Sequence, residues 1–240
     1  MLNRFKPDLP PPQPGDYCSL CNYPRLPHER VCGHCLELAR DRKAEKELTR
    51  ERELELVEKL GGWRPYEEYL ADKFRPSSVT QPALDACLRF DHERENIYLW
   101  SSNPGTGKSH LSVVAARKAF DRGVDGRVLK PNELFREIRQ TYDEDATERD
   151  GDVISRAVRL PIFVLDDLGT QKDTEWNVSC LYDFVDGRYA HRPGGLIVTA
   201  NLSLEQARKR WGGRIASRLE QMVGRLCFDL SAEPDHRRIA

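Results

Sequence analysis

The segment SSNPGTGKSH, residues 101–110, constrains the fold of this chain more than any other feature of its sequence. It follows an apolar stretch, NIYLW, that is typical of a buried strand, and it leads into a helical stretch that begins near Lys108. Gly105 and Gly107 allow positive φ, so that successive backbone N–H groups can converge on an anion at the start of the helix. A strand, a glycine-containing loop and a helix in this order predict a phosphate-binding loop.

The residue types in this loop predict a nucleotide with β- and γ-phosphates, bound together with Mg²⁺. Lys108 would reach the β- and γ-phosphates, and the Ser109 hydroxyl would ligate the metal. Ser102 stands where the pattern G-x-x-x-x-G-K-S has its first glycine, but that position leaves the strand and need not touch phosphate. The residues expected to hold the nucleotide are Asn103, Pro104, Gly105, Thr106, Gly107, Lys108, Ser109 and His110.

A second polar site follows the apolar strand in IFVLDDLG, residues 162–169. Asp166, at the carboxyl end of the strand, is placed to hold the Mg²⁺ shell, and Asp167 is the candidate base that polarises the attacking water. A polar strand end at a turn would look the same if it stood alone. Together with the phosphate loop, the two acids favour hydrolysis, because small-molecule kinases with such a loop usually carry no extra carboxylate for water.

From Trp63 onward, short apolar runs alternate with helical stretches. The runs predict strands at 96–102, 127–130, 162–166, 195–201 and 226–230. The stretches between them predict helices from Lys108 and over about 132–142, 148–159 and 173–190. This alternation predicts an α/β fold, a parallel sheet with helices on both faces. The segment between Lys108 and Asp166 leaves room for a strand inserted between the two motif strands.

Asn201 ends the fourth predicted strand, GLIVTAN. At the tip of a strand beside the phosphate loop, its amide could touch the γ-phosphate or the attacking water. A helix N-cap or a turn would use an asparagine at the same position equally well. Both interpretations remain open.

Four of the seven cysteines form two C-x-x-C pairs near the N-terminus. Four thiolates at this spacing are typical of a tetrahedral structural Zn²⁺ site, and a redox C-x-x-C is disfavoured because there are two pairs. Few apolar residues lie nearby, so the metal would supply most of the folding free energy of this module. The predicted zinc ligands are Cys18, Cys21, Cys32 and Cys35.

These features divide the chain into four predicted parts. Residues 1–17 are a proline-rich flexible lead, 18–38 the zinc module, 39–62 a charged linker helix, and 63–240 the nucleotide-binding domain. A net charge of −1 excludes a general polycation, so nucleic acid would bind only through a local patch. There is no apolar signal region and no apolar run long enough to span a bilayer, so we expect a soluble, cytoplasmic protein without a membrane partner.

Six segments, taken in order, resemble the bacterial and phage replicative helicase loaders, the DnaC/IstB-like AAA+ ATPases. The resemblance covers roughly residues 63–240 and is far more specific than a phosphate loop alone. It implies an AAA+ P-loop core with a five-stranded parallel sheet and no room for a C-terminal lid. The segments are NPGTGKSHL (103–111), VLDDLG (164–169), TEW (174–176), LYDFVDGRY (181–189), TANLSL (199–204) and RIASRL (214–219).

The resemblance also implies roles for residues late in the chain. Asn201 would be the sensor of the fourth strand. Arg218, in Ser-Arg-Leu, resembles the arginine finger that reaches the ATP of a neighbouring subunit, and its fixed fork suits charge on a transferring phosphoryl group. Arg214, one helical turn away, is the rival candidate. Arg237 and Arg238 could contact the γ-phosphate as a second sensor.

The function that the resemblance implies is ATP-dependent loading of a DnaB-type replicative helicase onto single-stranded DNA, with self-association or assembly on a ring. Residues 1–61 carry as many basic as acidic side chains, which favours docking on the helicase over DNA binding by the zinc module. Two alternatives stay open. One is an IstB-like transposition helper ATPase, and the other is a zinc adaptor whose nucleotide site is a switch without hydrolysis.

Two segments are candidates for contact with single-stranded DNA. The first surrounds the helix after the second strand, where Lys130, Arg136 and Arg139 lie near Phe135 and Tyr142. Basic grooves with stacking aromatic side chains favour single strands. A solvated amphipathic helix would show the same pattern. The second candidate is the basic segment 208–240, part of which could instead serve a neighbouring ATP.

Overall fold

The computed structural model describes residues 71–142, 150–191 and 194–236, together with Tyr69 and five helical positions near the N-terminus. Those five positions are Glu37, Arg40, Asp41, Lys43 and Glu47. The chain divides into two units after Glu55, and each is described by itself. In the first unit, Lys43 and Glu47 form an i,i+4 ion pair at 3.7 Å, the spacing expected of a helix.

Several predicted features lie outside the described residues. These are the proline-rich lead, the four cysteines of the zinc module and the arginines at positions 237 and 238. The predicted boundaries between the four parts of the chain stay predictions.

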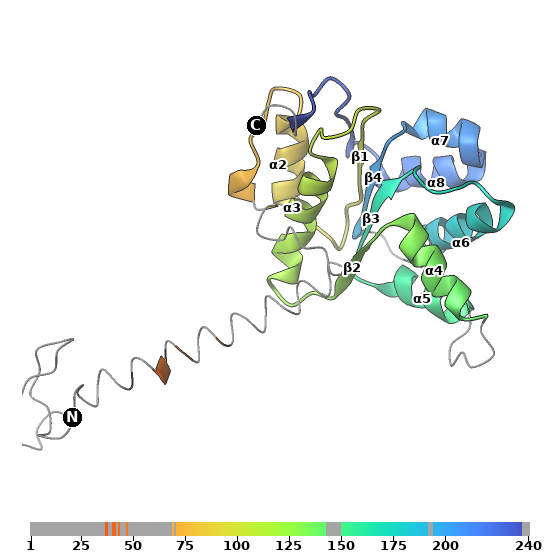
Figure 1. The fold of residues 1–240 in the computed structure, drawn as a ribbon, viewed down its shortest axis with the longest axis horizontal. Coiled ribbons are helices and arrows are strands. Elements are labelled where there is room, and N and C mark those ends of the chain that lie inside the picture. The colour runs from red at the N-terminus through yellow and green to blue at the C-terminus, as the bar shows by residue number, and fades with distance from the viewer. Residues whose placement is uncertain are drawn as a thin grey trace, which may run out of the picture. The chain divides into compact units, whose positions relative to one another are not determined.

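Within the described part of the chain, five parallel strands form one sheet in the order β2-β3-β4-β1-β5 (Figure 1). The strands are β1 (Ile97–Trp100), β2 (Gly126–Leu129), β3 (Ile162–Leu168), β4 (Leu196–Ala200) and β5 (Cys227–Asp229). The five-stranded parallel sheet predicted from the sequence is therefore confirmed. The segment between Lys108 and Asp166 contains β2, but this strand lies at the edge of the sheet. The strand between the two motif strands is instead β4, which follows Asp166 in the sequence.

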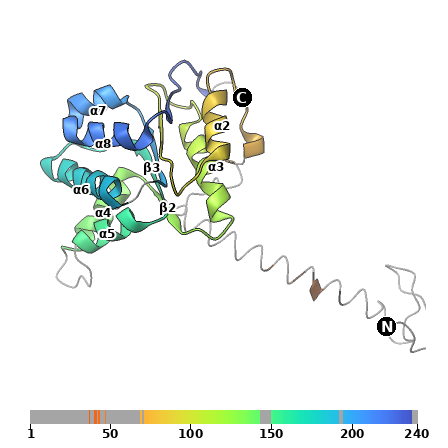
Figure 2. The same cartoon turned by 180° about the vertical axis from the view of Figure 1, so that it is seen from behind.

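Seven helices and one short 3₁₀ helix surround the sheet within residues 71–236, the gaps in the description aside. They are η1 (Ala71–Lys73), α2 (Gln81–Arg89), α3 (Lys108–Phe120), α4 (Pro131–Gln140), α5 (Asp150–Arg159), α6 (Glu175–His191), α7 (Leu204–Trp211) and α8 (Gly213–Val223). Helices α2 and α3 cover one face, and α4, α5, α6 and α8 lie on the other (Figures 1 and 2).

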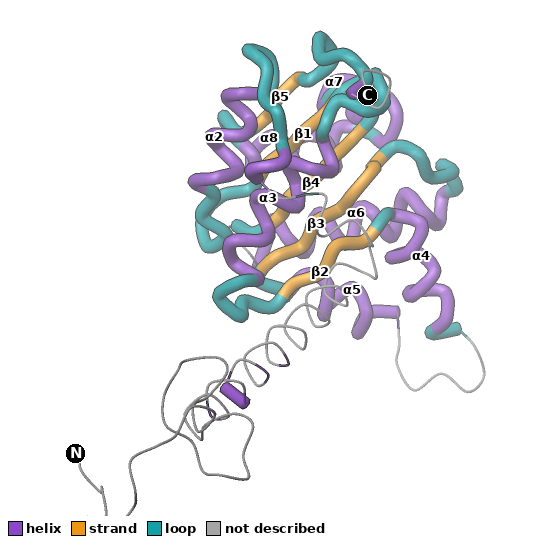
Figure 3. The backbone as a smooth tube through the Cα atoms, turned by 60° about the vertical axis from the view of Figure 1, so that its left-hand side comes forward, coloured by secondary structure: helices purple, strands orange, loops and turns teal. Residues whose placement is uncertain are grey.

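Alternation along the strands produces these two faces. In β1, Tyr98 is buried against the α4–α8 side, whereas Ile97 and Leu99 are buried against α2 and α3. The strands run nearly side by side through the middle of the domain (Figure 3). Because both faces are covered by helices, the central strands read as continuous apolar runs, which is why the sequence predicted them well.

Helices α2, α7 and α8 were not predicted from the sequence. They are short, at 9, 8 and 11 residues, and α7 is strongly charged. A local signal for α7 is nevertheless present. Ser203 and Gln206 form a capping box, in which the Ser203 hydroxyl accepts from the Gln206 N–H at 3.2 Å and the Gln206 side chain accepts from the Ser203 N–H at 2.7 Å.

A fully buried arginine fixes the amino ends of two strands. Arg188, on α6, is 0% exposed and donates to the carbonyls of Val158 and Leu160 at 3.0 and 2.6 Å and to that of Gly194 at 2.9 Å. Its fork thereby joins the end of α5 to the segments that enter β3 and β4. The sequence did not indicate this role, because an arginine on a helix is usually exposed.

None of the helices in the described ranges has the length and the apolar character that a membrane crossing requires.

Candidate nucleotide-binding site

The loop between β1 and α3 has the conformation that its glycines allow. Gly105 and Gly107 have φ values of 70° and 84°, in the region that glycine adopts without strain. A Cβ atom at Gly107 would lie 2.6 Å from Cε2 of Phe74, so the space around this position also excludes a side chain. Helix α3 begins at Lys108, which leaves the first N–H groups of the helix directed at the loop.

Lys108 and Ser109 lie at the start of α3 with their side chains directed to the loop and to β3. The Lys108 Nζ donates to the Asn103 carbonyl at 3.1 Å and lies 3.4 Å from the Thr106 hydroxyl. The Ser109 hydroxyl donates to the Asp166 carboxylate at 2.8 Å. The structure therefore joins the phosphate loop to the acid at the end of β3, two features far apart in the sequence.

Asp166 is buried, at 2% exposure, and receives two hydroxyl hydrogen bonds. One comes from Ser109 and the other from Thr199 on β4, at 2.7 Å. Burial raises the pKa of Asp166 above its usual value, and the hydrogen bonds from Thr199 and Ser109 offset part of that rise. A carboxylate and a hydroxyl side by side at a phosphate loop are hard oxygen donors, so these residues fit Mg²⁺.

Asp167 adopts a backbone conformation that is rare for a residue other than glycine. Its φ is 63°, in the left-handed region, at a cost of about 1–3 kcal/mol. Its N–H donates to the Thr199 hydroxyl at 2.8 Å, and its carbonyl accepts from the Thr170 hydroxyl at 2.9 Å. The pairing of β3 with β4 shifts register between Leu165 and Leu168, so the two acids sit at an irregularity of the sheet.

Thr199, near the carboxyl end of β4, contacts both acids at the carboxyl end of β3. The sequence analysis did not predict this role. The Thr199 hydroxyl donates to Asp166 and accepts from the N–H of Asp167, so one buried side chain orients both acids. In GLIVTAN, Thr199 stands two positions before Asn201, but a threonine is common in strands and this local pattern does not single it out.

Asn201 follows β4 and lies against the segment after Asp167. Its N–H donates to the Leu168 carbonyl at 3.2 Å. Gly169 has φ of 105°, and a Cβ atom there would lie 2.1 Å from the Asn201 Oδ1. The predicted sensor side chain therefore touches the backbone two residues beyond Asp167, and only glycine leaves it room.

His110 packs among aromatic rings near the loop. Its ring meets those of Tyr69 and Phe74 edge to face, with centroids 4.9 and 5.0 Å apart. Phe74 is the side chain that covers Gly107. This packing anchors the start of α3 and supports the loop from behind.

The segment after β5 lies on the phosphate loop, a contact that the sequence did not indicate. The His236 N–H donates to the Gly105 carbonyl at 3.1 Å, and the Asn103 side chain donates to the Ser231 carbonyl at 2.7 Å. The N–H of Ser102 also donates to the Ser231 hydroxyl, at 3.3 Å. The serine that replaces the usual glycine thus has its backbone engaged by the C-terminal segment.

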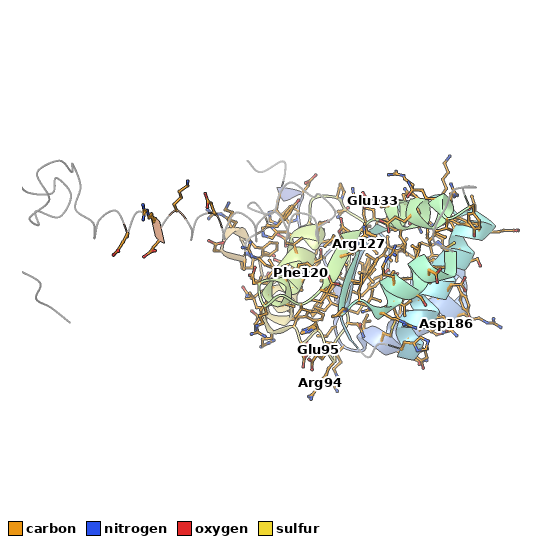
Figure 4. All side chains as sticks on the ribbon, turned by 90° about the horizontal axis from the view of Figure 1, so that it is seen from below. Arg94, Glu95, Phe120, Arg127, Glu133 and Asp186 are labelled. Carbon is orange, nitrogen blue, oxygen red and sulfur yellow. The ribbon has the colours of Figure 1, made fainter. Side chains whose placement is uncertain are left out.

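Arg218 lies between α8 and α6, on the side of the sheet opposite α3. It pairs with Asp186 at 2.6 Å, and its guanidinium lies 4.8 Å from the Tyr182 ring centroid. Figure 4 shows Asp186 on the α6 side and Phe120, at the end of α3, on the other. Arg214, in the first turn of α8, is exposed. The assignment of an arginine finger to either residue stays a prediction.

The predicted zinc site lies outside the described residues. Within the ranges that the structure describes, no group of three or more His, Cys, Asp or Glu side chains could hold a metal ion. Cys87 and Cys180 are buried and Cys227 is half-buried, as expected of small apolar residues.

The strand order and the loop after β1, which faces an acid at the end of β3, define an AAA+ P-loop domain of the nucleotide-binding class. The chain belongs to the family of IstB-like ATP-binding proteins, whose model matches residues 34–226.

Individual relatives agree with this family. The chain is 23% identical over 123 residues to the replicative helicase loader DnaC of Escherichia coli (strain K12). This match covers 51% of this chain and 49% of DnaC. It is also 28% identical over 141 residues to a protein of insertion sequence IS5376 from Geobacillus stearothermophilus. This second match covers 56% of this chain and 52% of that protein. The chain spans about half the length of the curated relatives it matches.

A solved structure has the same fold. The crystal structure of the DnaC helicase loader superposes with a TM-score of 0.59 at 23% identity, over 69% of this chain and 99% of that one. The AAA+ core predicted from the sequence is therefore confirmed.

Proposed function

We propose that this protein binds and hydrolyses ATP with Mg²⁺ and uses that cycle to load a replicative DNA helicase. The observation that carries the proposal is the 2.8 Å contact between Ser109 and Asp166, which brings the phosphate loop to the acid pair. A loop that holds phosphates needs no such acids for binding alone. Their position beside the loop favours hydrolysis.

The chain's own residues divide the work in this proposal. The N–H groups of residues 104–109 and the Lys108 ammonium bind the β- and γ-phosphates. Ser109 and Asp166 hold Mg²⁺, which neutralises charge that develops on the phosphates. Asp167 orients the attacking water and accepts its proton, and Asn201 lies within the same edge to contact the water or the γ-phosphate.

The partner we propose is a DnaB-type helicase, because the match to DnaC extends over half of this chain. The match to the insertion-sequence protein keeps the transposition helper as the second candidate. Pull-down of the full-length protein with a purified helicase and with a purified transposase separates them. We expect the helicase to be retained, and only when residues 1–61 are present. If only the transposase is retained, the function is that of a transposition helper and not of a helicase loader.

We further propose that the two C-x-x-C pairs bind one structural Zn²⁺ that folds the helicase-docking module. Elemental analysis of protein purified without chelator should find one zinc per chain. Cys18→Ser with Cys21→Ser should remove zinc and helicase binding, because two thiolates cannot complete the tetrahedral shell. ATP affinity should stay within about twofold, since a separate domain holds the nucleotide. Purified protein that contains no zinc and still binds helicase would contradict this proposal.

A cluster of aromatic and basic side chains at the ends of α4 and α6 supports contact with single-stranded DNA. The Arg139 guanidinium lies 4.6 Å from the Trp176 ring centroid, and the Tyr142 ring lies edge-on to Trp176 at 6.4 Å. Phe135 packs behind Trp176 at 6.1 Å. Tyr142 is 59% exposed, so the cluster offers a ring and a cation to unpaired bases. We propose this cluster as the contact with single-stranded DNA. Trp176 lies shortly after Asp167 in the chain, so the cluster is close in sequence to the proposed base.

Replacing Trp176 by alanine should weaken binding of a fluorescent oligothymidine about tenfold, because one stacking surface is lost. Fluorescence anisotropy at fixed salt measures the effect. Tyr189→Ala is the matched control, since Tyr189 is an exposed aromatic residue at the other end of α6. Equal affinities for the two variants would show that the DNA site lies elsewhere.

Self-association is part of the proposal because an arginine finger acts on a neighbouring ATP. Arg214 is exposed and free to meet a second copy at the surface of α8. Arg218 would first have to leave Asp186 and Tyr182. An ATP hydrolysis rate per chain that rises with protein concentration would indicate self-association. A lower rate after substitution of Arg214 or of Arg218 would identify which of the two is the finger.

A further inference from the structure

The segment that follows Asp167 is held by a residue that has no role in the function proposed above. Arg210, on α7, donates from Nη1 to the Gly169 carbonyl at 2.6 Å and from Nη2 to the Gln171 carbonyl at 3.1 Å. Its Nε donates to the Asp173 carboxylate at 2.5 Å. Within the described residues, the side-chain hydrogen bonds of Arg210 therefore all go to residues 169–173.

Asp173 is shared between two neighbouring side chains of α7. One carboxylate oxygen accepts from Arg210, and the other accepts from the Trp211 indole N–H at 2.9 Å. Burial alone would raise the pKa of Asp173, but the hydrogen bonds from Arg210 and Trp211 outweigh it and the pKa is lowered. The carboxylate is thus charged and held in place. We call Arg210, Trp211 and Asp173 the α7 clasp.

The clasped segment is continuous with the strained backbone at Asp167. The Gly169 N–H donates to the Gln171 side chain at 2.8 Å, and Gln171 is itself 4% exposed. The Thr170 hydroxyl donates back to the Asp167 carbonyl. Thr199 holds the backbone of Asp167 from its amino side, and this segment holds it from its carboxyl side. A strained backbone conformation of this kind persists where the surrounding structure over-determines it.

We propose that Arg210 is a positioning residue for hydrolysis, which keeps residues 169–173 in place so that Asp167 retains its left-handed conformation and faces the nucleotide. This inference rests on the proposed ATPase function. Arg210 makes no contact with the phosphate loop, so it acts on the hydrolytic step and not on nucleotide binding. The planar fork is needed for the full effect, because a lysine ammonium cannot reach two carbonyls and a carboxylate in that geometry.

The test uses full-length protein and the variants Arg210→Gln and Arg210→Lys. ATP affinity is measured by calorimetry and the hydrolysis rate in single turnover. Arg210→Gln should slow hydrolysis about tenfold with an ATP affinity within about twofold of wild type, as expected when a reacting group is displaced without loss of binding. Arg210→Lys keeps the ion pair with Asp173 and should have an intermediate rate.

Arg127→Gln is the matched control. Arg127 on β2 forms a bidentate pair with Glu137 at 2.8 and 2.7 Å, and its side chain is 35% exposed, against 31% for Arg210. Arg127→Gln therefore removes the same charge and a pair of similar burial. Arg127 lies opposite Phe163 in the sheet and forms its ion pair with α4, so residues 169–173 keep their contacts and hydrolysis should not change. If Arg210→Gln does not fold, Asp173→Asn tests the same clasp, with an expected loss of about threefold.

Three outcomes overturn the inference. Hydrolysis at the wild-type rate in Arg210→Gln and Asp173→Asn would show that the clasp has no part in catalysis. Parallel loss of ATP affinity and hydrolysis would show a merely structural role. If wild-type protein does not hydrolyse ATP even with helicase and single-stranded DNA, the proposed function and this inference both fall, whereas the first outcome leaves the proposed function intact.

Discussion

Replacing Asp167 by asparagine is expected to slow ATP hydrolysis by about 10²–10⁴-fold, the range for removal of a general base. ATP should still bind, because Asp167 is not among the residues that we propose hold the phosphates. Asparagine also adopts the left-handed region readily, so the backbone at φ 63° should be preserved. The variant therefore removes the base while the hydrogen bonds of Thr199 and Thr170 to this residue remain.

Single-turnover hydrolysis and calorimetric titration with ATP measure the two effects separately. Asp85→Asn is the control, because Asp85 accepts a hydrogen bond from Gln81 on its own helix, α2, and asparagine can accept the same bond. A protein that loads helicase equally well with Asp167→Asn would favour the switch without hydrolysis. An unchanged hydrolysis rate would remove Asp167 from the mechanism.

Replacing Lys108 by alanine is expected to weaken ATP binding about a hundredfold, because a charge-assisted contact to two phosphates is lost from a site built for anions. The Lys108 ammonium donates to the Asn103 carbonyl and lies near the Thr106 hydroxyl, both in its own loop. Because α3 packs on the sheet through buried apolar residues that follow Lys108, loss of the lysine should leave the fold of α3 and the sheet intact.

Calorimetric titration with ATP and with ADP measures the loss, and thermal unfolding in the absence of nucleotide checks the fold. Lys118→Ala is the matched control, since Lys118 is an exposed residue near the other end of α3 and its removal changes the net charge equally. Equal affinities for the two variants would show that the loop does not hold the phosphates through Lys108.

Much of the fold could be predicted from local sequence. Each of the five strands was expected within a few residues of its place, because buried parallel strands are continuous apolar runs. The phosphate loop was recognisable because glycine and lysine occur there at fixed spacing between a strand and a helix. Helices α2, α7 and α8 were missed, since they are short and half of the residues of α7 are charged.

The site was only partly predictable. Asp166 and Asp167 could be chosen because acids at the end of an apolar strand are conspicuous. Thr199 could not, because a threonine within a strand is ordinary until its neighbours across the sheet are known. Arg210 belonged to a basic stretch that suggested DNA or a neighbouring ATP, and its bonds to Gly169 and Gln171 follow only from the packing of α7 beside the β3–α6 connection.

Local patterns in the amino-acid sequence were enough to predict a phosphate loop after one strand and two acids at the end of another, because each pattern is formed by neighbours in the chain. The folded chain was needed to show that β4 lies between those strands, that Thr199 bonds to both acids and that Arg210 holds the segment beyond them. Hydrogen bonds and ion pairs between distant segments depend on strand order and helix packing, which no local pattern encodes.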